Sequence, residues 1–201
     1  RRGSGASRER VQHGKAVDAC LSCPPAAGVP TGTRSGDLDP GMMSFLARTE
    51  SMSAQQFTEM VNSKSGLLGM SETSSDMRAL LKCENQDVRA AEAVALFCYQ
   101  VKKWVGSFAA ALGGLDTLVF AGGIGEHSPV VRARVCDGLE FLGLMINEKA
   151  NATSEGVISA AASPVIVRVI HTDEEQMIAR SVCCVLGLRC TADSPTKFKD
   201  M

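Results

Sequence analysis

The spacing of apolar residues divides the chain into a helical first part and a second part with strands. The longest helical pattern extends from about Asp87 to Leu112, where apolar residues recur every three or four positions before Gly113-Gly114. Earlier helices are expected from Met42 and from Ser53, which forms a capping box with Gln56. A break at residues 65–69 follows, and then a further helix start with Ser75 as its candidate cap.

Short apolar runs replace this period after Gly114. Residues 116–121 are typical of a buried parallel strand, and a glycine-rich turn then leads to Ser128-Pro129, which opens a helix with proline in its first position. Residues 144–146 and 164–170 predict further strands, and residues 173–186 predict a closing helix. Residues 10–17 predict two short strands around His13-Gly14. This order predicts an α/β domain with at least one crossover between parallel strands.

Composition narrows the class of protein. The 201 residues carry a formal net charge of −1 and are 45% hydrophobic, enough for a sizeable core. Neither nucleic acid nor a membrane is expected as a partner, because there is no basic excess and apolar runs end well before ~18 residues. Eight cysteines without disulfide-like spacing favour a reducing, cytoplasmic location. The chain begins Arg1-Arg2-Gly3 without Met, as expected of a piece of a longer protein.

The clearest chemical signal lies at residues 122–128. A strand that feeds a glycine-rich turn into a helix directs backbone N–H groups at an anion, and glycine lets a nucleotide approach the backbone. The segment has no Lys-Ser/Thr of a P-loop, and Ser128 stands where a dinucleotide fingerprint has its third glycine. Nucleotide binding, an ordinary tight turn and a Rossmann-type NAD domain all remain open from this pattern.

Three further segments carry charged residues whose role the pattern leaves open. Arg34 lies among glycines and acids. An arginine in this setting can stabilise phosphoryl charge, but composition alone favours a salt bridge within the loop. Asp76 begins a helix, where an acid ordinarily complements the dipole. Thr172 and Glu175 fit a capping box, which leaves Glu174 to face the end of the preceding strand and hold Mg²⁺ beside nucleotide phosphates.

Five motifs occur in an order that resembles the acetate kinase family over about residues 26–186. They are GTRSGDLDPG at 32–41, SGLLG at 65–69, SSDMR at 74–78, FAGGIGEHS at 120–128 and TDEE at 172–175. The resemblance implies an α/β fold of the actin-like, sugar-kinase and heat-shock ATPase (ribonuclease H-like) type, with this chain as the C-terminal half of a two-domain kinase. Residues 1–25 would be a partial phosphate-loop hairpin and divergent loop, 26–187 the nucleotide-binding kinase domain and 188–201 a disordered tail.

The resemblance also assigns roles to individual residues. Arg34 matches the arginine that stabilises the phosphoryl group in transfer, and Glu174 matches the Mg²⁺-binding glutamate. Residues that match the nucleotide site fall in three segments: Gly3, Ser4 and Gly5; Asp76, Met77 and Arg78; and Gly123, Ile124, Gly125, Glu126 and His127. The family often has Asn at the positions of Ser4 and His127. It also differs over residues 18–25, so Cys20 and Cys23 are not expected to form a metal site.

The activity implied by the resemblance is reversible phosphoryl transfer between ATP and acetate, giving acetyl phosphate and ADP, by a cytoplasmic homodimer. A propionate or butyrate kinase of the same family is the near alternative. The family's N-terminal domain, with its acetate pocket and catalytic histidine, has no match in the sequence. A truncated, non-catalytic nucleotide-binding module is therefore a further alternative.

Overall fold

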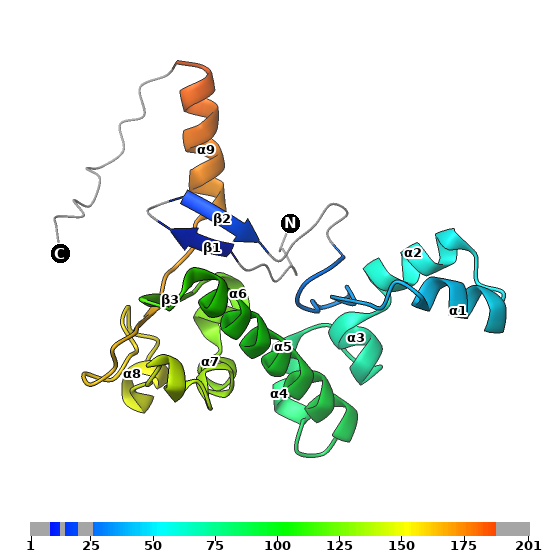
Figure 1. The fold of residues 1–201 in the computed structure, drawn as a ribbon, viewed down its shortest axis with the longest axis horizontal. Coiled ribbons are helices and arrows are strands. Elements are labelled where there is room, and N and C mark those ends of the chain that lie inside the picture. The colour runs from blue at the N-terminus through cyan, green and yellow to red at the C-terminus, as the bar shows by residue number, and fades with distance from the viewer. Residues whose placement is uncertain (1–8, 13–14, 20–25, 188–201) are drawn as a thin grey trace. The chain divides into compact units, whose positions relative to one another are not determined.

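The computed structural model describes residues 9–12, 15–19 and 26–187, which fall into two compact units, residues 1–170 and 171–201 (Figure 1). In the first unit, the strands β1 (Glu9–Gln12) and β2 (Lys15–Ala19) pair antiparallel, with Gln12 opposite Lys15. This pairing confirms the two strands predicted on either side of residues 13–14.

Four short helices follow: α1 (Met42–Thr49), α2 (Ala54–Ser63), α3 (Gly66–Ser71) and α4 (Met77–Cys83). The capping box before α2 is confirmed, because Ser53 Oγ accepts from the Gln56 N–H and Gln56 Oε1 accepts from the Ser53 N–H. The predicted cap of α4 was wrong. Asp76 rather than Ser75 caps this helix, since its carboxylate accepts from the N–H of Arg78.

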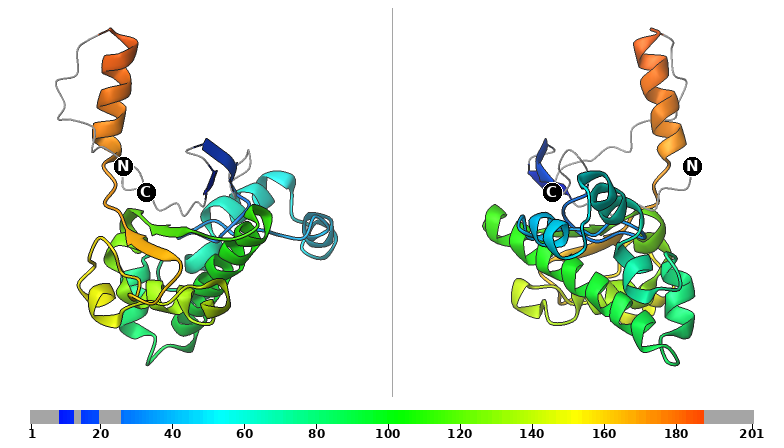
Figure 2. Two further views of the ribbon diagram at one scale, coloured as in Figure 1. Left: turned by 60° about the vertical axis from the view of Figure 1, so that its left-hand side comes forward. Right: turned by 90° about the vertical axis from the view of Figure 1, so that its right-hand side faces the viewer.

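The scaffold of the first unit is the long helix α5 (Val88–Leu112), and α3, α4 and α7 pack against it (Figures 1 and 2). Its limits confirm the sequence pattern, with Asp87 as N-cap and Gly113 as a left-handed C-cap. Apolar side chains at helical spacing are buried along one side of α5: Ala90, Ala93, Val94, Phe97, Val101, Val105 and Phe108. The core of the unit therefore forms along this helix.

Two parallel strands, β3 (Thr117–Phe120) and β4 (Ile166–Val169), pair from Thr117 opposite Ile166 to Phe120 opposite Val169. The connection between them contains α6 (Gly122–His127), α7 (Pro129–Cys136), the 3₁₀ turn η1 (Glu140–Leu142) and α8 (Glu148–Ala152). Parallel pairing across an intervening helical segment confirms the predicted crossover unit. Ser128 caps α7 and Pro129 is its first residue, also as predicted.

Two expectations about strands were wrong. Residues 144–146 do not form a strand, because the backbone N–H of Met145 bonds to the Ser163 hydroxyl, and Ile146 makes only an isolated bridge with Ser159. Nor is β3 buried on both faces. Successive side chains of a strand alternate between faces, and here Phe120 enters the core while Val119 remains 45% exposed.

The second unit contains helix α9 (Glu174–Val185), close to the predicted limits. Its N-cap is Asp173, whose Oδ1 accepts from the Gln176 N–H at 2.9 Å. The predicted capping box of Thr172 and Glu175 was therefore wrong. Because the helix begins one residue later than that motif requires, Glu175 occupies the second helical position instead of the third.

Candidate functional site

The loop that carries Arg34 is closed by hydrogen bonds within itself. The Gly28 N–H donates to Asp37 Oδ1 at 2.8 Å, and the Asp37 N–H donates back to the Gly28 carbonyl at 3.1 Å. At the tip, the Thr31 N–H donates to the Arg34 carbonyl at 3.0 Å, and the Arg34 N–H donates to Thr31 Oγ1 at 3.1 Å. The backbone of Arg34 is thus fixed on both sides.

The same loop is bound to the start of α3. The N–H groups of Leu67 and Leu68 donate to the carbonyls of Thr31 and Gly32, both at 2.9 Å. Gly66 makes this approach possible. It has a φ of +62°, and a Cβ at this position would lie 2.6 Å from the Arg34 carbonyl oxygen and closer still to that of Thr31. Only glycine can occupy this position without displacing the loop.

The guanidinium of Arg34 forms no hydrogen bond or ion pair with any residue that the structure describes. The nearby acids accept hydrogen bonds from backbone groups instead, Asp37 from the Gly28 N–H and Asp39 from the Gly41 N–H at 2.6 Å. A loop salt bridge, the simplest structural explanation of Arg34, is therefore absent from the described part of the chain. The result is a fixed backbone whose guanidinium has no partner within residues 9–12, 15–19 and 26–187.

The start of α4 presents a second charged feature. Asp76 and Arg78 form a bidentate pair, with Arg78 Nε 3.1 Å and Nη2 2.7 Å from the carboxylate oxygens. The Arg78 guanidinium and the Arg78 backbone N–H hold the pKa of Asp76 down at about 2. Met77 differs from its two neighbours because it is only 2% exposed and packs in the core. Asp76 and Arg78 alone of this triplet are accessible to a ligand.

The predicted glycine-rich turn after β3 is itself the short helix α6. Gly122 adopts a φ of +70°, and its N–H donates to Glu126 Oε1 at 2.7 Å. The prediction that this N–H is unpaired and directed at an anion was therefore wrong for Gly122, because a carboxylate of the same segment accepts from it. Glu126 is buried, and its carboxylate connects the end of α6 back to its start. His127, the last residue of the helix, is exposed.

The other two glycines of α6 differ in what surrounds them. A Cβ on Gly125 would lie 3.3 Å from the carbonyl carbon of Phe120, so this glycine lets α6 pack closely on the end of β3. A Cβ on Gly123 would meet no described atom within 4 Å. Gly123 therefore marks the open face of the loop, where a ligand can reach the backbone.

Arg132, on α7, contacts the α6 segment, and the sequence patterns did not indicate it. It is 0% exposed and donates to the carbonyl oxygens of Gly125 and Glu126, at 2.7 and 2.8 Å. The available signal was its spacing along α7. Arg132 and Cys136 lie four residues apart and therefore on one side of the helix, as do the buried Val131 and Val135. An arginine on the buried side of an apolar helix needs internal acceptors.

The Arg34 loop, the start of α4 and α6 belong to one scaffold. The loop is bonded to α3, α3 and α4 pack against α5, and α6 packs against α7, which also packs on α5. The remaining predicted residues cannot be compared with them. Gly3, Ser4 and Gly5 lie outside the described residues, and Glu174 begins α9 in the second unit, with its side chain outside the described part.

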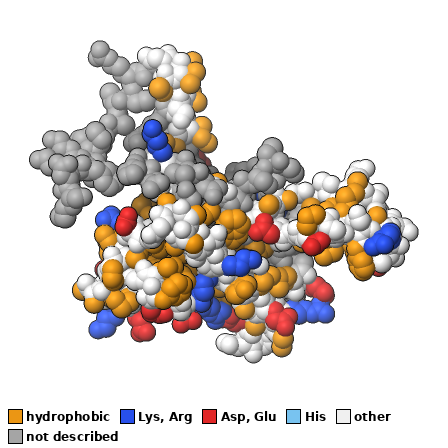
Figure 3. Space-filling view, viewed as in Figure 1, with side chains coloured by type: hydrophobic (Ala, Val, Ile, Leu, Met, Phe, Trp, Pro, Cys, Tyr) orange, Lys and Arg blue, Asp and Glu red, His pale blue; other side chains and the backbone are white. Residues whose placement is uncertain are grey.

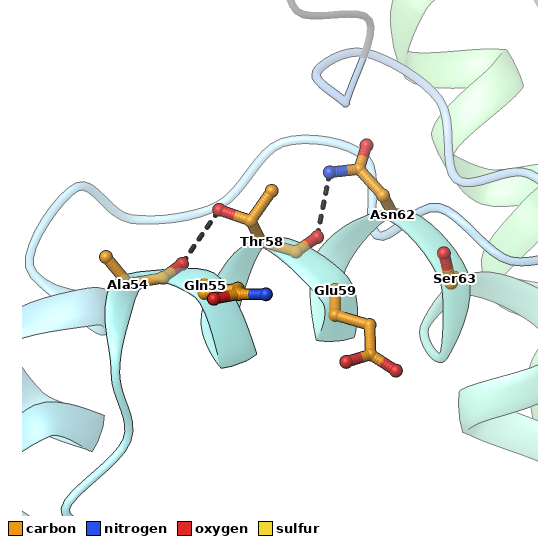
Figure 4. Close-up of a pocket in the computed structure, with 6 residues that line it drawn as sticks. All are labelled: Ala54, Gln55, Thr58, Glu59, Asn62 and Ser63. Atoms are coloured by element: carbon orange, nitrogen blue, oxygen red, sulfur yellow. Dashed lines mark hydrogen bonds between the residues drawn. The ribbon is translucent and has the colours of Figure 1, made fainter.

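A surface hollow on α2 offers no alternative site (Figure 4). The residues that line it all come from this one helix. Two of their polar side chains bond back to the helix itself, Thr58 Oγ1 to the Ala54 carbonyl and Asn62 Nδ2 to the Thr58 carbonyl, both at 2.8 Å. None of the predicted site residues lies there.

A sequence model of the acetokinase family matches residues 2–180. The chain belongs to the acetokinase family. An acetate kinase of Porphyromonas gingivalis is 44% identical over 188 residues, which cover 92% of this chain and 47% of that protein. The crystal structure of Porphyromonas gingivalis acetate kinase is similar, with a TM-score of 0.85 at 43% identity. The match covers 91% of this chain and 47% of the chain in that structure.

A propionate kinase from Francisella tularensis is also similar in structure, with a TM-score of 0.84 at 36% identity. This match covers 88% of this chain and 46% of the propionate kinase chain. These similarities confirm the predicted α/β kinase fold of the actin-like superfamily. The chain spans about half the length of the curated relatives it matches.

Proposed function

We propose that this chain supplies the nucleotide-binding and charge-stabilising part of an acetate kinase, which transfers a phosphoryl group between ATP and acetate to give acetyl phosphate and ADP. The observation that carries the proposal is Arg34. Its backbone is held by Thr31 and by the start of α3, while its guanidinium has no partner among the described residues. Fixing a backbone while leaving a cation unpaired suits a group that must meet charge arriving with a ligand.

Each segment then has a separate task. Arg34 would stabilise the charge on the phosphoryl group during transfer, an effect worth about 10³–10⁵ in rate in other phosphotransferases. The open face of α6 at Gly123 would receive the adenosine. Asp76 and Arg78 would line the nucleotide site beside it, and Gly3, Ser4 and Gly5 would contact the phosphates. Most of the catalysis would come from positioning and electrostatic stabilisation rather than from covalent chemistry.

The family resemblance implies Mg²⁺ with a single protein ligand. Within the described residues there is no group of three or more His, Cys, Asp or Glu side chains that could hold a metal ion. Mg²⁺ is commonly held by one or two carboxylates together with substrate phosphates and water. We assign the carboxylate to Glu174, and the ion when bound would neutralise phosphate charge.

The family resemblance also supports a cytoplasmic homodimer as the working assembly. No helix in the described part of the chain has the length and apolar character needed to span a membrane. Helix α1, all of which is described, has no buried residue and exposes Met42, Met43 and Phe45. Figure 3 shows hydrophobic surface over the region of α1 and α2. Such apolar exposure is compatible with cover by another subunit.

A propionate kinase is the second candidate, because the Francisella tularensis structure is nearly as similar as the acetate kinase structure. Both candidates share the nucleotide site and differ in the acyl group that accepts the phosphoryl group. Comparing acetate with propionate as acceptor in the same assay separates the two.

The test is acyl phosphate formation by a full-length enzyme, in which the N-terminal half of an acetate kinase precedes this chain, with ATP, Mg²⁺ and acetate or propionate, trapped with hydroxylamine. We expect acetate-dependent product, and a loss of about 10³-fold or more in Arg34→Ala. ADP binding by calorimetry should change little in this variant. Arg48→Ala is the control, because Arg48 is an exposed arginine of α1 outside the predicted site.

Undiminished turnover in Arg34→Ala would contradict the role of Arg34. ADP binding by the unaltered chain without any turnover would show a non-catalytic nucleotide-binding module instead. Binding of NAD in preference to ADP would indicate a dinucleotide site at α6.

A further inference from the structure

Arg132 uses all of its donor capacity inside the protein. Besides the carbonyls of Gly125 and Glu126, its Nε–H donates to Asn151 Oδ1 at 2.8 Å. Its Nη2 donates to the Asn151 carbonyl at 2.7 Å and to Ser154 Oγ at 2.9 Å. A guanidinium has five N–H groups, and these five acceptors account for every one of them. Arg132 therefore joins α6 to α8 through a fully satisfied buried cluster.

The same acceptors explain how the buried, charged guanidinium of Arg132 is stabilised in the core. Burial lowers the pKa of Arg132, since a charged group loses its hydration in the core. Two of the carbonyls come from the last turn of α6 and one from the last turn of α8. Helix C-termini carry partial negative charge, so these carbonyls replace the water that the guanidinium has lost.

Helix α6 is consequently fixed at both ends from inside the protein. The Glu126 carboxylate accepts from the Gly122 N–H at its start, and the guanidinium of Arg132 binds the carbonyls of Gly125 and Glu126 at its end. The exposed face at Gly123 lies between these two anchors. A helix of six residues has little stability of its own, so its conformation depends on such contacts.

We propose that Arg132 is a positioning residue that holds α6 in the conformation in which its open face binds the adenosine part of the nucleotide. This inference rests on the proposed function for the identity of the ligand. Lysine cannot replace Arg132, because a compact ammonium with three donors cannot bind α6 and α8 at once as the planar fork does. Asn151 supports the same geometry by donating its Nδ2–H to the Pro129 carbonyl at 2.9 Å.

The experiment compares Arg132→Lys with Arg134→Lys in the full chain. Arg134 lies on the same helix, but its guanidinium pairs with Glu84 and does not contact α6. We expect Arg132→Lys to bind ADP about tenfold more weakly, equivalent to about 1.4 kcal/mol, and inorganic pyrophosphate with unchanged affinity. In the absence of nucleotide, hydrogen exchange of backbone amides should be faster in Arg132→Lys than in the unaltered chain, and the increase should be larger at α6 than at α5. Arg134→Lys should match the unaltered chain in all three measurements.

Unchanged ADP affinity and unchanged exchange at α6 in Arg132→Lys would overturn the proposal. Equal weakening of ADP and pyrophosphate, together with uniformly faster exchange, would also overturn it, because a general loss of stability has that signature. Failure of the unaltered chain to bind ADP would refute the proposed function, whereas the exchange measurement would still decide whether Arg132 fixes α6.

If the Arg132→Lys variant does not fold, hydrogen exchange in the unaltered chain tests the proposal instead. Coupling through Arg132 predicts that the Ser128 amide, bonded to the Ile124 carbonyl, opens together with the Asn151 amide, bonded to the Asn147 carbonyl. The two should then show the same opening free energy across a series of low denaturant concentrations. Independent opening of α6 would overturn the proposal.

Discussion

The close contact between Gly66 and the Arg34 loop predicts that Gly66→Ala destabilises the protein strongly. The added Cβ would stand 2.6 Å from the Arg34 carbonyl oxygen, and both the loop and α3 present backbone at this point. Backbone cannot rotate away as the end of a flexible side chain can. Alanine at this position therefore separates α3 from the loop that holds Arg34.

The magnitude follows from the contacts that are lost. An L-residue in the left-handed region costs roughly 1–2 kcal/mol relative to glycine. Separation of α3 from the loop also breaks the hydrogen bonds from Leu67 and Leu68 to Thr31 and Gly32, each worth about 1 kcal/mol. The free energy of unfolding should fall by about 3–4 kcal/mol, which is large for one methyl group.

Urea unfolding followed by circular dichroism and by fluorescence of Trp104, the single tryptophan, measures this change. Gly106→Ala is the matched control. Gly106 lies inside α5, and a Cβ there would meet no described atom within 4 Å, so alanine should stabilise the helix by about 0.5–1 kcal/mol. A Gly66→Ala variant within 0.5 kcal/mol of the unaltered chain, where ~0.5 is the usual effect of a surface change, would refute the reasoning.

Two further predictions concern ionisable groups. Asp76→Ala should lower the free energy of unfolding by about 1 kcal/mol at pH 7, as expected for a lost helix cap. Because the folded pKa of Asp76, about 2, lies below its unfolded value of about 4, this difference should persist above pH ~4 and disappear as the pH falls toward 2, as measured by urea unfolding across pH. Burial raises the pKa of Cys98 to about 11 and that of Cys136 to about 12, whereas Cys184 is exposed. Iodoacetamide at pH 8 should therefore label Cys184 well before the two buried thiols, as peptide mass spectrometry would show; equal labelling would contradict their burial.

Local signals in the sequence were sufficient for several helix starts, although the capping box of Thr172 and Glu175 shows that a local motif can also mislead. The capping box of Ser53, the helix start at Asp87 and the Ser128-Pro129 start each depend on residues within one turn. The predicted cap of α4, Ser75, was one residue too early, because serine and aspartate are both good caps and Asp76 follows directly. The additional pairing of Asp76 with Arg78 favours the helix that begins after Asp76.

The parts that could not be predicted depend on contacts between distant segments. The partners of Arg132 lie as many as 22 residues away, and no local pattern shows that their carbonyls converge on one guanidinium. In the same way, the motif around Arg34 indicates chemistry, but only the folded chain shows that α3 holds its backbone and that neighbouring acids bind elsewhere. Residue types suggested a candidate site, and tertiary contacts show how the backbone of these residues is held.

The most direct test of the nucleotide site is a calorimetric titration of ADP into the unaltered chain and into Gly123→Val. Gly123 has no positive φ and no described atom within 4 Å of a built Cβ, so valine should leave the melting temperature unchanged. We predict saturable binding to the unaltered chain, and binding at least about tenfold weaker, or about 1.4 kcal/mol, in the variant. Equal affinity of the two chains for ADP, or no binding to the unaltered chain, would contradict the account.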